Sequence, residues 1–422
     1  MEEEKKKPHL IKRLFSVLGP GLVTGAADDD PSGIATYSIA GAQLGMRLLW
    51  LSWLTWPMMG AVQMMCARIG MVTGRGITGA LGEKFPRPLI LFAVCALFIA
   101  NTINVGSDLA GMADAAQLLS GVSSHIFVVM FGIGITIAIV RLKYHQIAGT
   151  LKWLALSLFA YVITAFLIHP DWSAVSSATF SPAIPKTSNE WSNIVAILGT
   201  TISPYLFFWQ ASQEVEEEKA MGRRMLRTRV GTSKQDLVNR MMDVGVGTFL
   251  SNIVMFFIIL TTALTLNAHG ITEITTSKQA AEALRPLAGN LATTLYTVGI
   301  LAVGFLAIPT LAGSAAYAFA EFFNWAEGLD NKLRQAKAFY VVIIFSIFCG
   351  IGIDFLRINP MKALYWTAII NGIMAPFMLI GIIMVARDKV IMHDHPSSKL
   401  SLVVVTITTL VMFFAAIAMF VF

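Results

Sequence analysis

The sequence predicts an all-α integral membrane protein with eleven transmembrane helices, and three observations carry this prediction. Hydrophobic residues make up 56% of the 422 residues, and the mean hydropathy is +0.68. Charged residues make up only 13%, whereas a soluble domain carries about 25%. The apolar runs are about 20 residues long, the length that spans a hydrocarbon core of about 30 Å. The first and sixth runs are broken by polar residues and proline.

The spans are expected to be helices, because lipid offers the backbone no hydrogen-bond partners. A cytosolic tail, residues 1–13, is followed by a first repeat over 14–169 and an extracellular loop over 170–190. A second repeat then covers 191–386, and a cytosolic loop with the eleventh helix covers 387–422. The expected spans are 14–44, 48–70, 88–118, 124–140, 150–169, 191–218, 243–267, 290–323, 338–355, 364–386 and 400–422.

The distribution of lysine and arginine predicts how the chain is oriented. With the N-terminus inside, the inner segments hold 25 of the 31 basic residues, which agrees with the positive-inside rule. The C-terminus is then outside, and the membrane is the plasma membrane, or the inner membrane in a bacterium. The net charge of +6 follows from this asymmetry, so no nucleic-acid partner is expected. The outer basic residues are Arg47, Lys186, Lys278, Arg285, Arg357 and Lys362.

Several classes of protein are excluded by missing motifs. No small-residue cleavage site follows the first apolar run, so no removable signal peptide is expected. Cys66, Cys95 and Cys349 lie in or at the ends of predicted spans, without the spacing of a disulfide framework or a metal cluster. The sequence contains no nucleotide-binding loop, no zinc-protease motif and no serine elbow. We therefore expect a protein that is not an enzyme and that holds no resident cofactor.

The first break, residues 28–33, places three aspartates, a proline, a serine and a glycine inside an apolar run. A carboxylate at the centre of a membrane helix costs about 2.5–3.5 kcal/mol on insertion scales. A cost of that size indicates an ion or substrate pathway. The alternative is a re-entrant or interfacial turn without a ligand. Which of Asp28, Asp29 and Asp30 faces a site stays open.

The second break lies in the sixth span, where Pro204 follows Gly199 and three hydroxyl residues. Proline in a helix interior leaves the carbonyl one turn earlier without its donor, and here that carbonyl belongs to Thr200. Taken alone, this span is also compatible with a simple proline kink. Broken helices at corresponding places in two halves are typical of an inverted repeat that binds a substrate between the two breaks. The charge run 214–219 at the end of this span is expected to be a solvated cytosolic face.

Polar residues also occur inside the third and tenth spans. Asn101, Asn104 and Asp108 share one face of the third helix, so Asp108 is expected to face the protein interior. It acts there either as an ion relay or as a satisfied structural hydrogen-bonding group. Asn371 is a polar residue of the tenth span.

The two breaks resemble the NRAMP family of divalent metal-ion transporters. The resemblance rests on Gly19-Pro20-Gly21, Asp30-Pro31-Ser32-Gly33 and Ala40-Gly41-Ala42-Gln43 in the first helix, on 199–205 in the sixth, and on the third helix. It extends over residues 14–422 and implies the LeuT-type fold and proton-linked import of divalent metal ions. Asp30 and Asp108 match acidic residues of the family. The chain departs from the family with Gly33 at an Asn, Ser203 at a Met, Tyr205 at a His, Gly111 at a Glu and Ala368 at a Gln.

These departures change the expected ion. A methionine sulfur is a soft ligand that favours transition metals, whereas the Ser203 hydroxyl leaves only oxygen ligands. Gly33 removes a ligand and opens space, which suits a partly hydrated Mg²⁺; Mn²⁺ also accepts oxygen ligands. Loss of the His and the Glu puts proton coupling in doubt. Coupling is either absent or runs through Asp28 and Asp29.

The sequence therefore predicts a secondary transporter of divalent metal cations, Mg²⁺ or Mn²⁺, with the lipid bilayer as its surroundings and protons or Na⁺ as candidate coupling ions. Two alternatives remain. One is a carrier of the same fold for a small solute or an anion such as bicarbonate. The other is a membrane sensor or assembly subunit that uses the loop 219–240. The expected metal site is Asp30, Gly33, Thr200 and Ser203, and the expected ion pathway is Asp28, Asp29, Asp108, Tyr205, Asn104 and Asn371.

Overall fold

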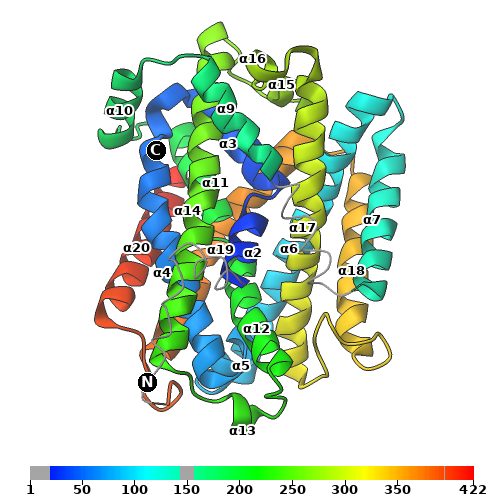
Figure 1. Ribbon diagram of the computed structural model, residues 1–422, viewed down its shortest axis with the longest axis vertical. Coiled ribbons are helices and arrows are strands. Elements are labelled where there is room, and N and C mark those ends of the chain that lie inside the picture. Colours follow the sequence, from blue (N-terminus) through cyan, green and yellow to red (C-terminus); the bar gives the residue numbers. More distant parts are fainter. Residues whose placement is uncertain (1–19, 143–155, 394) are drawn as a thin grey trace, which may run out of the picture.

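The computed structural model describes residues 20–142, 156–393 and 395–422, and these form a bundle of helices (Figure 1). The predicted tail 1–13, the start of the first span at 14–19 and the start of the fifth at 150–155 lie outside the described residues. Within the described residues, eight helical segments are long and apolar enough to cross a membrane, counting 188–220 as one segment.

Helices alternate with short connections in the first half of the chain. The first and fifth predicted spans are described only in part, so the number of eleven spans stays a prediction. The helices are α2 (Pro20–Asp28), α3 (Pro31–Leu44), α4 (Trp50–Thr73), α5 (Ile77–Gly82), α6 (Arg87–Ser120), α7 (Ser124–Arg141), α9 (Phe159–Leu167) and α10 (Trp172–Phe180).

The second half repeats the pattern of a broken helix followed by long helices. The helix that contains the seventh predicted span begins earlier, at Lys234, and has Arg240 and Asp243 on a buried face. The helices are α11 (Ser188–Thr201), α12 (Pro204–Ala220), α13 (Leu226–Arg229), α14 (Lys234–Thr265), α15 (Ser277–Glu282), α16 (Arg285–Ala288), α17 (Ala292–Phe323), α18 (Lys337–Asp354), α19 (Pro360–Ala386) and α20 (Lys399–Val421).

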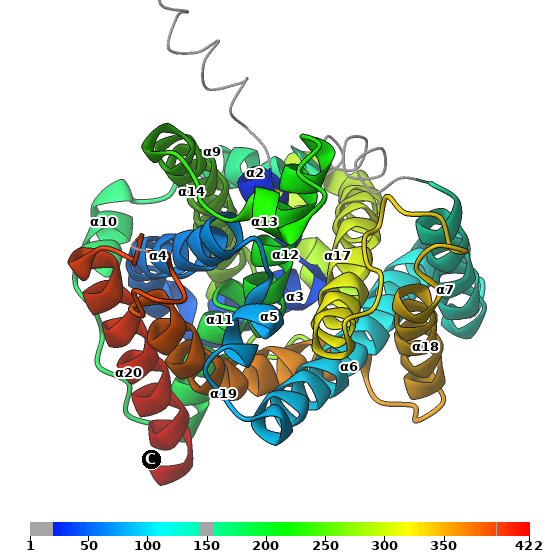
Figure 2. The same ribbon diagram turned by 90° about the horizontal axis from the view of Figure 1, so that it is seen from below.

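The two broken helices occupy the middle of the bundle. α2, α3, α11 and α12 lie inside a ring of α4, α6, α14, α17 and α19 (Figures 1 and 2). The outer helices carry large apolar side chains that face outward, such as Phe345 on α18, 58% exposed, and Phe414 on α20, 61% exposed. Such surfaces suit lipid, which is as apolar as the side chains themselves.

Glycine contacts hold the broken helices against their neighbours. A β-carbon at Gly25 would lie 2.5 Å from the backbone of Gly247, and one at Gly247 would lie 2.3 Å from the Gly21 carbonyl oxygen. A β-carbon at Gly199 would lie 2.0 Å from the Ala368 carbonyl oxygen. Glycine at such crossings lets helix backbones approach closely. α2 therefore packs backbone to backbone on α14, and α11 does the same on α19.

The connecting segments separate to the two ends of the bundle. α5 and α13 lie at one end, called here the α13 end, and α10, α15 and α16 lie at the other, called here the α10 end (Figure 1). At the α10 end the ring of Phe422 stacks on Trp191, with centroids 6.3 Å apart. The connections that hold α5 and α13 thus lie opposite those that hold α10, α15 and α16, and which end faces the cytosol stays a prediction.

Candidate functional site

Two helix breaks lie in contact at the centre of the bundle. α2 gives way to α3 over residues 28–31, and α11 gives way to α12 over residues 201–204. Proline is the first residue of both α3 and α12, a position that suits its fixed φ and missing N–H. A β-carbon at Gly33 would lie 3.0 Å from Thr200 Oγ1, so the breaks face each other. Helix ends with free backbone groups therefore meet at one place.

Asp30 is the N-cap of α3 and points toward α6. Its Oδ1 accepts hydrogen bonds from the Gly33 N–H at 2.7 Å and from Ser32 Oγ at 2.9 Å. Its Oδ2 accepts from Asn104 Nδ2 at 3.2 Å. Asp30 is 1% exposed and Asn104 is fully buried. The cap fixes the carboxylate at the break, and Asn104 turns it toward the third span.

Asp28 and Asp29 point the other way, toward α14. The Ser251 hydroxyl lies 2.7 Å from Asp28 Oδ2 and 3.2 Å from Asp29 Oδ1, so the two carboxylates share one donor. Both side chains are buried. The three consecutive aspartates therefore divide between two sides of the break. One carboxylate faces α6 and two face α14.

Several buried oxygen atoms near Asp30 have no hydrogen-bond partner within the described part of the chain. They are Asn104 Oδ1, both carboxylate oxygens of Asp108, and Thr200 Oγ1. The Ser32 backbone lies near Asp108 and the Tyr37 hydroxyl lies near Thr200, but neither contact has the geometry of a good hydrogen bond. Asp108 lies one turn beyond Asn104 on the same face of α6 and interacts electrostatically with Asp30. Buried polar atoms without partners are rare and call for an explanation such as a bound ion or water. These oxygens and the Asp30 carboxylate have the chemistry of a site for a hard cation.

Ser203, the residue before α12, bonds back to the last turn of α11. Its hydroxyl lies 2.5 Å from the Gly199 carbonyl oxygen and 3.0 Å from the Thr200 carbonyl oxygen. The Thr200 carbonyl predicted to be left free by Pro204 therefore accepts from Ser203 instead. A carbonyl oxygen has a second lone pair, so Thr200 retains capacity for a cation.

The other predicted residues take different places. Tyr205 Oη donates to the Ala27 carbonyl oxygen at 2.9 Å and so joins α12 to the end of α2. Asn371 is 3% exposed on α19, and no hydrogen bond found among the described residues links it to the aspartates. Its neighbour Gly372 packs against α11.

Replacing Tyr205 with phenylalanine is expected to lower the free energy of unfolding by about 1 kcal/mol, because the Ala27 carbonyl loses its side-chain donor. Thermal unfolding in detergent measures the change. Tyr365→Phe is the matched control, because no described group bonds the Tyr365 hydroxyl. Equal melting temperatures for the two variants would contradict a stabilising role for the Tyr205 bond.

Two polar residues at the centre were not anticipated. Ser251 is an ordinary serine of the seventh span, and no spacing in the sequence connects it to the aspartates. Gln63 on α4 is 1% exposed, and neither atom of its amide is paired within the described residues. It lines a narrow gap beside the second break together with Met59, Thr201 and Ser203. The sequence pointed to Gln63 in one way, because a polar residue in the otherwise apolar second span needs a buried polar environment.

The charge run 214–219 is not the solvated face that its composition predicts. Glu214 is 1% exposed and Glu218 is 5% exposed. Glu218 pairs with Arg223 at 2.7 Å, and Glu214 pairs with Arg240 of α14 at 2.8 Å. Partners from other segments bury these carboxylates, and the run itself contains no sign of them.

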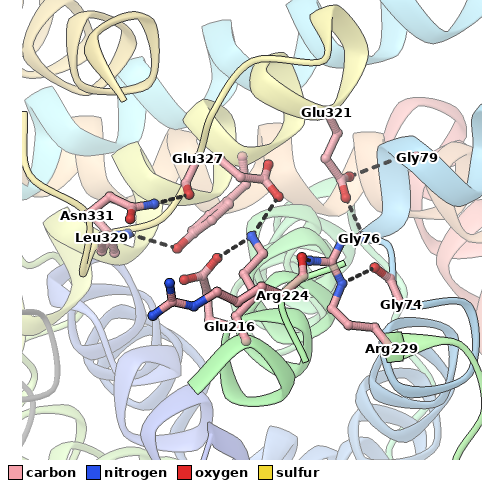
Figure 3. Close-up of polar contacts among 12 residues, drawn as sticks. Gly74, Gly76, Gly79, Glu216, Arg224, Arg229, Glu321, Glu327, Leu329 and Asn331 are labelled. Carbon is pink, nitrogen blue, oxygen red and sulfur yellow. Dashed lines mark hydrogen bonds and ion pairs between the residues drawn. The ribbon is translucent and has the colours of Figure 1, made fainter. Parts of the chain in front are cut away.

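A polar network that includes Glu216, Glu321 and Glu327 lies at the α13 end (Figure 3), and Lys219 links two of these carboxylates. Its Nζ lies 2.8 Å from Glu216 Oε1 and 3.2 Å from Glu327 Oε1, in the connection after α17. Glu321 accepts from the Gly76 N–H and, at 3.0 Å, from the Gly79 N–H at the start of α5. These contacts join α12, α17 and α5 around the end of the bundle.

The central site is closed in this structure. Its predicted side chains are at most 4% exposed. In the described ranges, no group of three or more His, Cys, Asp or Glu side chains is arranged to hold a metal ion. A cation at the breaks would therefore rely on hydroxyl, amide and carbonyl oxygens as well as carboxylates.

Residues 21–422 match the protein family described as natural resistance-associated macrophage protein-like, Nramp. A "divalent metal cation transporter MntH" from Yersinia enterocolitica is 26% identical over 411 residues, 93% of this chain and 92% of the relative. Another from Deinococcus radiodurans is 27% identical over 404 residues, 91% of this chain and 85% of the relative.

Solved structures share the fold. A manganese transporter from Eremococcus coleocola has a TM-score of 0.73 at 18% identity, covering 98% of this chain and 89% of its own. Mhp1, a nucleobase-cation-symport-1 family transporter in a closed conformation, has a TM-score of 0.54 at 14% identity, covering 95% and 90%. The predicted LeuT-type fold with two broken helices is confirmed.

Proposed function

This chain belongs to the Nramp family, and from that membership we propose that it carries divalent metal cations across a membrane. The relatives named above are divalent metal cation transporters, and this chain matches them over 92% and 85% of their length. The observation that carries the proposal for this chain is the set of buried, unpartnered oxygens beside Asp30 at the meeting of the two breaks. The cation is the cargo, and no resident cofactor is proposed.

The donor set favours a hard cation. Asp30 and Asp108 supply negative charge, and Asn104, Thr200 and Ser203 supply neutral oxygens. Gly33 leaves space between the breaks, since a β-carbon there would already be 3.0 Å from Thr200 Oγ1. No sulfur or imidazole ligand is included, so the proposed cargo is Mg²⁺ or Mn²⁺, with some of its water retained.

Asp28 and Asp29 are proposed to hold the coupling ion. They are buried side by side and share the single hydroxyl of Ser251. Two enclosed carboxylates repel each other unless a cation or a proton is present. Either H⁺ or Na⁺ satisfies this requirement. Asp30 then binds the transported cation on the α6 side, and Asp28 and Asp29 bind the coupling ion on the α14 side.

The α13 end is proposed to face the cytosol of a plasma membrane, or of an inner membrane in a bacterium. The connections at this end hold most of the basic residues, as the positive-inside rule requires. Transport would proceed by alternating access, with the half-helices around the breaks opening first to one side and then to the other. Asn371 and Tyr205 would lie at the moving contacts of α19 and α12.

Flux of Mg²⁺, Mn²⁺ and Ca²⁺ into proteoliposomes, with a pH dye inside and with Na⁺ present or absent outside, tests the proposal. Saturable uptake of Mg²⁺ or Mn²⁺ supports a divalent cation carrier, and acidification or Na⁺ dependence identifies the coupling ion. Absence of uptake of all three ions by folded, monodisperse protein would contradict it. The same vesicles would then be tested with bicarbonate and small solutes.

Glu327 is expected to make stability depend on pH. Burial raises the pKa of Glu327 to about 7, the Glu321 carboxylate adds to the rise, and Lys219 opposes it. The folded protein then binds this proton more tightly than the unfolded chain, so stability falls as pH rises toward 7 and is constant above it. Arg229 also opposes the rise, and Glu216 is a further charged group that interacts with Glu327.

Glu327→Gln, which mimics the protonated form, should melt roughly 2 °C or more above the unmodified protein at pH 8. The difference should shrink as pH falls from 7 to 5.5. Thermal unfolding at several pH values measures it, with the half-exposed Glu83→Gln as a control for the change in net charge. A difference that does not vary with pH would show that this carboxyl is not the titrating group.

A further inference from the structure

Arg240 joins three carboxylates from two helices at the α13 end. Its Nη1 donates to Asp243 Oδ2 at 2.6 Å on its own helix, α14. Its Nε lies 2.8 Å from Glu214 Oε1 on α12, and its Nη2 contacts Glu217 on α12. Arg240 is 8% exposed and Glu214 is 1% exposed. One guanidinium therefore bridges α14 and α12 in a setting where charges need partners.

Asp243 also links this bridge to α2 through two hydrogen bonds. Its Oδ2 accepts from the Gly21 N–H at 2.8 Å, and its Oδ1 accepts from the Leu22 N–H at 3.1 Å. The first N–H groups of a helix have no partner within the helix, so this carboxylate satisfies two of them. It also places negative charge at the positive end of the helix dipole. Asp243 is fully buried.

The glycine crossing makes α2 and the adjoining part of α14 a single packed unit. Gly21 and Gly25 of α2 face Gly247 of α14 with backbones in contact. α2 cannot leave α14 without opening both this crossing and the two Asp243 bonds. The contacts of this unit with α12 are fewer, and they include the Arg240 bridge at the α13 end and the Tyr205–Ala27 bond near the breaks.

We propose that Arg240 and Asp243 form a latch that holds the inner half of the first broken helix closed, and that α2 and α14 move together when it opens. Opening separates Arg240 from Glu214 and Glu217 while Asp243 keeps its bonds to α2. Asp243 is therefore a positioning residue for the aspartates at the end of α2. The role of the latch in transport rests on the proposed function, whereas its contacts are present in the fold whatever the protein carries.

Accessibility of a buried cysteine tests the latch without any cargo. Ala27, fully buried at the end of α2, is replaced by cysteine in a chain whose three native cysteines are alanine. A membrane-impermeant maleimide is then added to each side of oriented vesicles. In Arg240→Gln, labelling at position 27 from the α13 side should be at least tenfold faster than with Arg240 present. Labelling from the α10 side should not increase.

Matched variants separate the latch from a general loss of charge. Arg223→Gln removes another ion pair at the same end, whose arginine is 44% exposed, and should leave labelling unchanged. Arg240→Lys keeps the charge and is used if Arg240→Gln does not fold, with an expected intermediate rate. Asp243→Asn keeps the shape and one acceptor, and should also speed labelling.

Unchanged labelling in folded Arg240 variants, or equal acceleration in Arg223→Gln, would overturn the latch. The outcome is independent of the proposed function. Faster labelling together with no divalent cation flux would keep the latch and reject the metal carrier. Unchanged labelling with normal Mg²⁺ or Mn²⁺ uptake would reject the latch and keep the metal carrier.

Discussion

Replacing Asp30 with asparagine is expected to reduce divalent cation uptake at least 100-fold while the protein remains folded. Asparagine has the same shape and is an equally good N-cap, so its side-chain oxygen can still accept from the Gly33 N–H. The carboxylate charge at the meeting of the breaks is lost, and a neutral amide is a much weaker partner for a dehydrated divalent ion. Proteoliposome uptake of Mn²⁺ and Mg²⁺, together with thermal unfolding of the same sample, measures both effects.

Ser32→Ala is the matched control for Asp30. It removes a hydrogen bond of 2.9 Å to the same carboxylate but leaves the charge in place. We expect its uptake to stay within a fewfold of the unmodified protein. If Asp30→Asn transports as well as this control, the central role given to Asp30 is wrong, and Asp108 becomes the residue to replace next.

Gly199→Ala is expected to destabilise the protein by about 3 kcal/mol or more, the largest stability effect that the structure suggests. Its β-carbon would lie 2.0 Å from the Ala368 carbonyl oxygen and 2.3 Å from the Gly372 N, with backbone atoms on both sides. Overpacking that a side-chain rotation cannot relieve usually costs 1–3 kcal/mol or more. Thermal unfolding and size-exclusion behaviour in detergent measure the loss.

Gly134→Ala provides the contrast within the same fold. It lies inside α7, and nothing described in the structure comes within 4 Å of its added β-carbon. Because alanine is the better helix former by up to about 1 kcal/mol, this variant should be as stable as the unmodified protein or slightly more so. Similar losses for both glycines would mean that helix propensity, rather than the contact of α11 with α19, governs these positions.

The two breaks could be predicted from the sequence because their cause is local. Three consecutive carboxylates before a proline, and a proline after a glycine and three hydroxyl residues, favour a break in a membrane helix, and Pro31 and Pro204 stand at the first positions of α3 and α12 as that reasoning requires. Proline alone is not sufficient, because Pro57, Pro309 and Pro376 lie inside continuous helices. Burial of Asp108 was predictable for a similar reason, since a carboxylate in an apolar span avoids lipid.

The directions of the aspartates could not be predicted, because they depend on distant partners. Ser251 binds Asp28 and Asp29 from more than 200 residues away, and Asn104 binds Asp30 from the third span. The charge run after Trp209 was misinterpreted for the same reason. Its composition suits a solvated surface, and only the fold brings Arg240 and Glu327 against it.

The hydroxyl of Ser203 also limits what the centre can recognise. A hydroxyl has one hydrogen, and this one is directed at the carbonyls of Gly199 and Thr200. Toward the breaks Ser203 can then offer lone pairs only. Asp30, Asp108 and the Thr200 carbonyl likewise offer only acceptors when the acids are ionised. Acceptors therefore outnumber donors in this lining, although the Thr200 hydroxyl can still donate and Asn104 Nδ2 donates to Asp30. Such a lining favours a cation and offers an oxyanion such as bicarbonate few donors.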